Sequence, residues 1–300
     1  MTISKEQYHH PEYLVETDWL EQNLNSDNLR VFDCTVNVTP NPDSNKKKQI
    51  PFAYQSGIKN FKQAHIPGAG FIDILSDLSD ESANFPLVLP PRKKFIETMR
   101  NSGINNDSRV ILYSSTETNW AARVWWLMHA FGFNNAAILN GGWSKWKLEG
   151  RSISTEQCRY AKGDFTSISR PSLLSNKSEV LSAIGNNEIR IINSLPFPIY
   201  TGLSEITFGR KGRIADSVNV PFMDLHDPET GCYLPSGKLK KIFEKVDVDK
   251  AKSIIIYCGG GVAASNDAFA LTLLGYKNVS VYDGSMLEWG NDVSLPMDMG

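Results

Sequence analysis

The sequence is poor in the features that mark disulfide-bonded, zinc-binding and membrane-spanning proteins. Its 300 residues contain four cysteines, Cys34, Cys158, Cys232 and Cys258, and no two of them form a C-x-x-C pair. Such scattered cysteines indicate neither a disulfide framework nor a zinc site, and a reducing cytoplasm fits them best. No apolar stretch approaches the ~20 residues that cross a bilayer. The polar stretch up to Trp19 has no apolar segment typical of a secretory signal.

An excess of charge of one sign is lacking as well. The formal net charge is −2, so no general attraction to nucleic acid or to an anionic membrane is expected. A short basic run, Lys46 to Lys48, lies in a polar stretch and is interpreted as a solvent-exposed loop. With 41% hydrophobic and 21% charged residues, the composition is that of a globular protein with a sizeable core. The length suits one large or two ordinary domains.

The chain contains one pattern twice, and this repeat decides the predicted architecture. Residues 110–114 and 254–258 are short apolar runs that end in Tyr followed by a serine or a cysteine, 144 residues apart. A helical pattern comes next in each copy, over 120–131 and 263–274, and Gly132 or Gly275 is expected to end it. A second apolar run follows, over 136–139 and 279–282. The tryptophans that then match, Trp146 and Trp289, are expected in the core.

Short buried strands that alternate with helices are typical of parallel sheets covered on both faces. The predicted fold class is therefore α/β, with two tandem domains that each have a mainly parallel sheet and helices on both faces. We expect the first domain over residues 14–150 and the second over 172–300, where residues 175–178 look like the start of a helix. The polar, weakly patterned segment 151–171 is predicted to link them.

The residues next to Cys258 suggest a reactive role for this cysteine. It follows a buried strand and precedes Gly259, Gly260, Gly261, Val262 and Ala263. Consecutive glycines let the backbone curve closely around a ligand, and their N–H groups, with the N-terminus of the next helix, form an anion site. Such a site is expected to lower the pKa of the thiol and to hold a persulfide anion. The matching residue of the first copy is Ser114, with no glycine after it, so only the second copy is predicted to be catalytic.

The motifs then show a family resemblance. They lie at residues 65–69, 123–126, 130–132, 139–143, 218–222, 258–264 and 282–285. In order and spacing they resemble the tandem rhodanese sulfurtransferases, which include thiosulfate and 3-mercaptopyruvate sulfurtransferases. The resemblance implies that Cys258 takes a sulfane sulfur from a small donor. The persulfide then passes it to cyanide, to a thiol such as glutathione or thioredoxin, or to another protein. It implies no metal and no organic cofactor.

Three further residues are candidates for substrate binding. His65 matches a histidine that lies near the substrate in mercaptopyruvate-type relatives, although a hydrogen bond that pins the turn over 66–68 explains it as well. Arg210 and Arg213 are cations that can bind the carboxylate or sulfonate of a donor, and a solvent-exposed loop is the alternative. Asp283 and Ser285 follow a strand near Cys258 and are expected to cap that turn.

The sequence also departs from these relatives. They usually carry a substrate-binding arginine where residues 193–200 have none, and neither a basic residue nor a serine follows Cys258 within two positions. A non-enzymatic, regulatory or protein-binding rhodanese module therefore remains an alternative. A Cys-x5-Arg phosphatase is disfavoured, because Ala264 stands where the phosphate-clamping arginine is needed. If Arg210 or Arg213 reaches the donor, 3-mercaptopyruvate should be preferred over thiosulfate.

Overall fold

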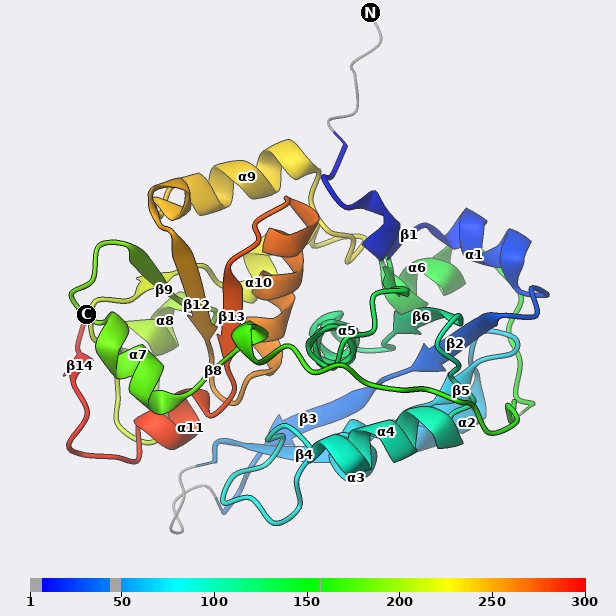
Figure 1. Cartoon of the computed structure of the whole chain (residues 1–300), viewed down its shortest axis with the longest axis horizontal. Coiled ribbons are helices and arrows are strands. Elements are labelled where there is room, and N and C mark those ends of the chain that lie inside the picture. The colour runs from blue at the N-terminus through cyan, green and yellow to red at the C-terminus, as the bar shows by residue number, and fades with distance from the viewer. Residues whose placement is uncertain (1–6, 44–49, 157) are drawn as a thin grey trace, which may run out of the picture.

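The computed structural model describes residues 7–43, 50–156 and 158–300, so the basic run from Lys46 to Lys48 lies outside the described residues. Two halves of the chain lie side by side, the first drawn in blue to green and the second in green to red (Figure 1). Among the described residues, no helix has the length and apolar character needed to cross a membrane.

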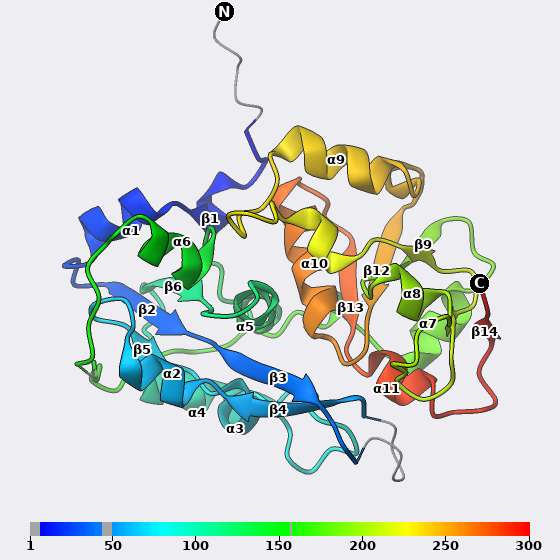
Figure 2. The same ribbon diagram turned by 180° about the vertical axis from the view of Figure 1, so that it is seen from behind.

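The first half is built on a parallel five-stranded sheet in the order β1-β7-β6-β2-β5. Its strands are β1 (Leu14–Val15), β2 (Leu29–Asp33), β5 (Gly70–Phe71), β6 (Arg109–Tyr113) and β7 (Ala136–Leu139). Its helices are α1 (Thr17–Asn23), α2 (Ile58–Gln63), α3 (Ile74–Asp77), α4 (Arg92–Asn101), α5 (Asn119–Ala130) and α6 (Gly142–Leu148). An antiparallel hairpin of β3 (Val36–Pro40) and β4 (Phe52–Ser56) extends from this half toward the second (Figures 1 and 2).

The second half repeats this sheet in the order β8-β13-β12-β9-β11, again all parallel. Its strands are β8 (Leu174–Ser175), β9 (Ile189–Asn193), β11 (Val218–Asn219), β12 (Ser253–Tyr257) and β13 (Val279–Tyr282), with an antiparallel pair of β10 (Arg213–Ile214) and β14 (Met297–Asp298). Its helices are α7 (Lys177–Ala183), α8 (Phe197–Tyr200), α9 (Ser236–Glu244), α10 (Val262–Leu273) and α11 (Ser285–Trp289). Short 3-10 helices are η1 (Pro11–Tyr13), η2 (Pro171–Leu173), η3 (Phe222–Leu225) and η4 (Val248–Lys250). The predicted α/β class with two mainly parallel sheets is confirmed.

Alternating side chains of the strands explain why helices cover both faces of a sheet. In β6, Val110 and Leu112 pack into one buried cluster while Ile111 and Tyr113 pack into the other. The first cluster faces α4 and α5, and the second contains residues of α1, α2 and α6. The first cluster continues through the second half, so the two halves share apolar core.

Local sequence signals agree with the ends of the elements. Asn176 caps α7 with a complete capping box, in which its side chain accepts from the N–H groups of Ser178 and Glu179. Gly132 and Gly275 each follow the helix predicted before them, and both have a φ of 92°, which favours glycine. The two tryptophans expected in the core, Trp146 and Trp289, are completely buried.

The segment 151–171 packs against the first half. The ring of Phe165 is buried against Phe95 and Phe133, and the hydroxyl of Tyr160 donates to the carbonyl of Gly68 at 2.6 Å. The backbone of Ser154 forms an isolated antiparallel bridge with His65. A segment whose polar sequence predicts a simple link is thus held by a buried ring, a side-chain hydrogen bond and a backbone bridge.

The two halves meet where α5 and α10 lie side by side between the sheets (Figures 1 and 2). The rings of Trp125 and Phe269 make an edge-to-face contact there, with centroids 4.8 Å apart. Beside it, the guanidinium of Arg123 in α5 forms an ion pair with Asp283 of the second half, N to O 2.6 Å. Arg123 is completely buried and also donates to the carbonyl of Leu87 at 2.8 Å. A charge in this position is stable only because it is paired.

We predict that Arg123→Leu lowers the free energy of unfolding by about 3–5 kcal/mol, because it leaves the Asp283 carboxylate largely buried without its partner. Urea unfolding followed by tryptophan fluorescence measures this loss. The matched control is the double variant Arg123→Leu, Asp283→Leu, which removes both charges and should recover much of the stability. A single variant as stable as the double variant would contradict this role for the ion pair.

Candidate active site

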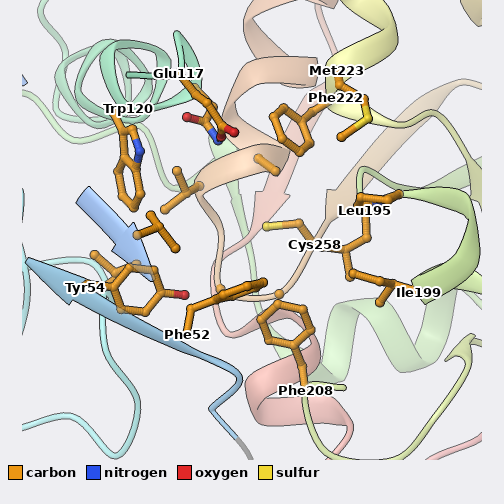
Figure 3. Close-up of a pocket in the computed structure, with 18 residues that line it drawn as sticks. Phe52, Tyr54, Glu117, Trp120, Leu195, Ile199, Phe208, Phe222, Met223 and Cys258 are labelled. Carbon is orange, nitrogen blue, oxygen red and sulfur yellow. The ribbon is translucent and has the colours of Figure 1, made fainter. Parts of the chain in front are cut away.

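Cys258 directly follows β12, the central strand of the second sheet, and α10 begins four residues later. Its position at the carboxyl end of a parallel strand is where open α/β sheets place their sites. The residue is 2% exposed, and its sulfur atom points into a cavity between the two halves (Figure 3).

The loop after Cys258 curves around the sulfur atom. The backbone N–H groups of Ala264, Gly260 and Gly261 lie near enough to the thiol to lower its pKa. Gly261 has a φ of 81°, in the left-handed region that favours glycine. At Gly259 a Cβ atom would come within 2.3 Å of the Phe208 ring, so a side chain does not fit there. The glycines thus allow both the curvature of the loop and its close packing.

Burial and the backbone N–H groups shift the pKa of the Cys258 thiol in opposite directions. Burial raises the pKa of the Cys258 thiol above its ordinary value, although the N–H groups of Ala264, Gly260 and Gly261 lower it. The expectation of a lowered thiol pKa is therefore wrong, because burial outweighs the N–H groups. The sequence shows the hydrogen-bond donors, but it does not show how completely the second half and its neighbours remove water from the thiol.

Ser285, the first residue of α11, holds the Cys258 loop in place. Its hydroxyl oxygen accepts from the N–H groups of Cys258 at 3.1 Å and Gly261 at 3.2 Å, and it donates to the carbonyl of Tyr282 at 2.7 Å. The residue is completely buried and has a φ of 48°, which is unusual for a residue other than glycine. Ser285 therefore does more than cap its own turn, because it also fixes the two ends of the Cys258 loop.

The cavity above Cys258 has a volume of about 360 Å³ and is lined by both halves of the chain. Its aromatic walls come from four separate segments, because Phe52 and Tyr54 both lie on β4 (Figure 3). The first half contributes Val38, Phe52, Tyr54, Leu87, Glu117, Asn119 and Trp120. The second half contributes Leu195, Pro196, Ile199, Phe208, Phe222, Met223, Cys258, Gly259, Gly260, Val262 and Ala263. Among these described lining residues, Glu117 is the only one with a charged side chain.

His65 lies away from this cavity. It is completely buried, its Nδ1 is 2.7 Å from the carbonyl oxygen of Phe61, and its Nε2 is 2.9 Å from that of Glu156. The imidazole also stacks on the Phe61 ring, with centroids 4.0 Å apart. The structure thus corrects its assignment to the substrate site, because both ring nitrogens face backbone carbonyl oxygens.

The two candidate arginines are also outside the cavity. The guanidinium of Arg210 donates to the carbonyls of Asp292 at 2.6 Å and Leu295 at 3.0 Å. Arg213 begins β10, and its guanidinium lies over the ring of Tyr200, 4.6 Å from its centroid. Both arginines are predicted to lie near the donor. Instead, Arg210 binds the C-terminal segment and Arg213 lies over a neighbouring ring. The preference for 3-mercaptopyruvate that was expected from these arginines therefore has no structural basis.

The residues that sequence reasoning missed are the aromatic walls. Phe52 lies on a hairpin of the first half, whereas Phe208 lies in a loop of the second half and Phe222 begins η3. No local pattern joins these positions. Trp120 gives a weak signal in the sequence, because it is a large aromatic residue at the start of the helical pattern over 120–131. The structure places it in the cavity wall.

Comparison with known proteins agrees with this geometry. The profile of the Rhodanese-like domain matches residues 16–149 and again 177–292. The chain belongs to the rhodanese family. Mouse thiosulfate sulfurtransferase is 31% identical to this rhodanese over 285 residues, which cover 92% of this chain and 91% of the mouse protein. The 3-mercaptopyruvate sulfurtransferase of Escherichia coli K12 is 30% identical over 288 residues, covering 95% and 98% of the two chains.

Among solved structures, SseA from Escherichia coli, described as a 3-mercaptopyruvate sulfotransferase, superposes on this rhodanese with a TM-score of 0.78 at 28% identity. The match covers 91% of this chain and 98% of SseA. An ergothioneine biosynthesis enzyme from Chlorobium limicola has a TM-score of 0.80 at 20% identity, a likeness that shows the fold alone.

We predict that alkylation of Cys258 by iodoacetamide speeds up with pH and levels off only above the free-thiol value of about 8.5, because burial raises the pKa of the thiol. Peptide mass mapping locates the label, and glutathione in the same buffers is the reference. Ser285→Gly removes a hydroxyl beside the thiol but suits the positive φ, so it should move the inflection further upward. An inflection below that of glutathione would contradict the prediction.

Proposed function

We propose that this rhodanese is a sulfurtransferase in which Cys258 carries a sulfane sulfur as a persulfide. The observation that carries the proposal is the position of the Cys258 sulfur, which receives N–H groups from its own loop on one side and opens into the cavity on the other. Relatives that match nearly the full length of the chain are named sulfurtransferases. A purely protein-binding module has no need for a buried thiol in such a cradle.

The reaction has two steps. In the first, the Cys258 thiolate attacks the sulfane sulfur of a donor such as thiosulfate or 3-mercaptopyruvate, and a Sγ–S bond forms. The donor's own bond to that sulfur breaks, and its electron pair leaves as sulfite or as the enolate of pyruvate. In the second, cyanide or a thiolate such as that of glutathione or thioredoxin attacks the outer sulfur and restores Cys258. The backbone N–H groups stabilise the negative charge on sulfur in both steps.

The two halves have different roles in this proposal. Residues 172–300 form the catalytic domain, with residues 151–171 as the connection. Residues 14–150 form a non-catalytic domain that supplies one wall of the cavity. At the position that matches Cys258, Ser114 is buried, and its hydroxyl contacts the N–H and hydroxyl groups of Thr116 instead of facing the cavity.

We predict that the wild-type protein gains one sulfur atom at Cys258 after incubation with thiosulfate or 3-mercaptopyruvate, and that Cys258→Ser gains none. Intact-mass measurement before and after addition of cyanide reads out both loading and discharge. The matched control is Cys232→Ser, which removes a half-buried thiol outside the cavity and should load normally. Loading of Cys258→Ser together with loss of loading in Cys232→Ser would refute the assignment.

We also predict that Ser114→Cys does not create a second sulfur carrier. The first copy lacks the glycine loop, its position 114 does not line the cavity, and the nearby Glu117 carboxylate opposes a thiolate. The double variant Ser114→Cys, Cys258→Ser should therefore release no thiocyanate from thiosulfate and cyanide, whereas Ser114→Cys alone should match the wild type. Thiocyanate production by the double variant would show that the cradle is dispensable.

A further inference from the structure

The hydroxyl group of Tyr54 is a hydrogen-bond donor in the cavity wall. Tyr54 lines the cavity from β4, and its hydroxyl makes no hydrogen bond to another described residue. Figure 3 shows the hydroxyl oxygen on the side of the ring that is nearer to Cys258. Burial, and after it the Cys258 sulfur, raises the pKa of this hydroxyl, so the group keeps its proton at neutral pH. The O–H of Tyr54 is therefore available to a molecule that enters the cavity.

Packing fixes Tyr54 relative to the glycine loop. The ring of Trp120 makes an edge-to-face contact with the Tyr54 ring, with centroids 6.1 Å apart. Two residues earlier on β4, the Phe52 ring contacts Phe208 of the second half, with centroids 6.0 Å apart. Phe208 in turn packs so closely on Gly259 that a Cβ atom there would come within 2.3 Å of its ring. A continuous series of contacts therefore joins the hairpin that carries Tyr54 to the loop that carries the thiol.

A donor oxygen atom in this cavity has to find its hydrogen bonds among neutral groups. None of the described lining residues is a lysine, an arginine or a histidine. The N–H groups of the glycine loop act on the Cys258 sulfur. The one carboxylate among these residues, Glu117, accepts from Nδ2 of Asn119 at 3.2 Å and lies at the other end of the cavity from Tyr54 (Figure 3). Neutral donors that are fixed in place stabilise negative charge in a site that excludes water, and the Tyr54 hydroxyl is such a donor.

We propose that the Tyr54 hydroxyl donates a hydrogen bond to an oxygen atom of the sulfur donor while Cys258 takes the sulfur. The proposal rests on the proposed role of Cys258 as a persulfide carrier and adds a substrate-binding residue from the first half. In thiosulfate the accepting atom is a sulfonate oxygen, and in 3-mercaptopyruvate it is the carbonyl oxygen next to the carbon that carries the sulfur. These oxygen atoms gain negative charge as the sulfur departs, so the hydrogen bond is strongest in the transition state.

The loading step balances without any further reactant. The lone pair of the Cys258 thiolate forms a bond to the sulfane sulfur, and the S–S bond of thiosulfate or the C–S bond of 3-mercaptopyruvate breaks. The electron pair stays on the departing sulfite or enolate of pyruvate, whose oxygen atom accepts from Tyr54. The proton that the Cys258 thiol gave up is taken up by the same departing group, and Tyr54 keeps its own proton throughout.

Tyr54→Phe tests the proposal, because it removes the hydroxyl and keeps the ring that packs against Trp120. In a two-step mechanism, kcat/KM for the donor reports loading and kcat/KM for cyanide reports discharge. With thiosulfate and cyanide as substrates, we expect Tyr54→Phe to lower kcat/KM for thiosulfate by about tenfold or more, because a charge-assisted hydrogen bond is lost. The value for 3-mercaptopyruvate should fall in the same way, whereas that for cyanide, which has no oxygen atom, should stay near the wild-type value.

Two controls isolate the hydroxyl and its acceptor. Tyr13→Phe makes the same change in η1, outside the cavity, where the ring packs on Trp125, and it should leave both constants unchanged. Inorganic polysulfide is a sulfur donor without oxygen atoms. Single-turnover loading from polysulfide, followed by intact mass, should therefore proceed at the same rate in Tyr54→Phe and in the wild type.

The outcomes separate the two proposals. If the wild-type protein gains no sulfur at Cys258 from any of the three donors, the proposed function fails. If it loads and turns over but Tyr54→Phe keeps the wild-type kcat/KM for thiosulfate and 3-mercaptopyruvate, the inference about Tyr54 is overturned while the proposed function stands. Equal slowing of loading from polysulfide and from thiosulfate would also overturn it, because the hydroxyl would then act on something other than the oxygen atoms of the donor.

Discussion

The ion pair between Arg123 and Asp283 is the constraint on which the rest of the structure depends. It joins α5 of the first half to the end of β13 in the second, and the backbone N–H of Leu89 adds a 2.7 Å hydrogen bond to the same carboxylate. Two residues beyond Asp283, the hydroxyl of Ser285 holds both ends of the Cys258 loop. A buried ion pair is costly to break, so the position of one half is linked to the geometry of the sulfur site in the other.

Closure of the two halves has two opposite effects on Cys258. Removal of water strengthens each hydrogen bond from the loop to sulfur, because the surrounding medium screens charge less. The same removal raises the pKa of the thiol, so the resting group favours its proton. A substrate that enters the cavity therefore either takes up the proton of the Cys258 thiol itself or causes the thiol to release it. In the proposed reaction the N–H groups stabilise charge that appears on sulfur, whereas the raised pKa disfavours a permanently ionised thiol.

The duplicated chain also separates two tasks. Both copies keep the strand, the following helix and the tryptophan that closes the core, because these determine whether each sheet can be covered. Only the second copy has a cysteine and a glycine loop directly after this strand, whereas the first has Ser114 there and presents Glu117, Asn119 and Trp120 to the cavity. The copy without this thiol thus supplies one wall of the cavity beside it.

The sequence by itself determined what depends on neighbours along the chain. The strand pattern of residues 254–258, the helix ends at Gly132 and Gly275 and the glycine loop after Cys258 follow from local geometry and periodicity, so the fold class and the cradle could be predicted. The cavity walls, the burial of the thiol and the true partners of His65 and Arg210 could not. These depend on contacts between segments that are far apart in the sequence, and only the packing of α5 against α10 brings such segments together and removes the water between them.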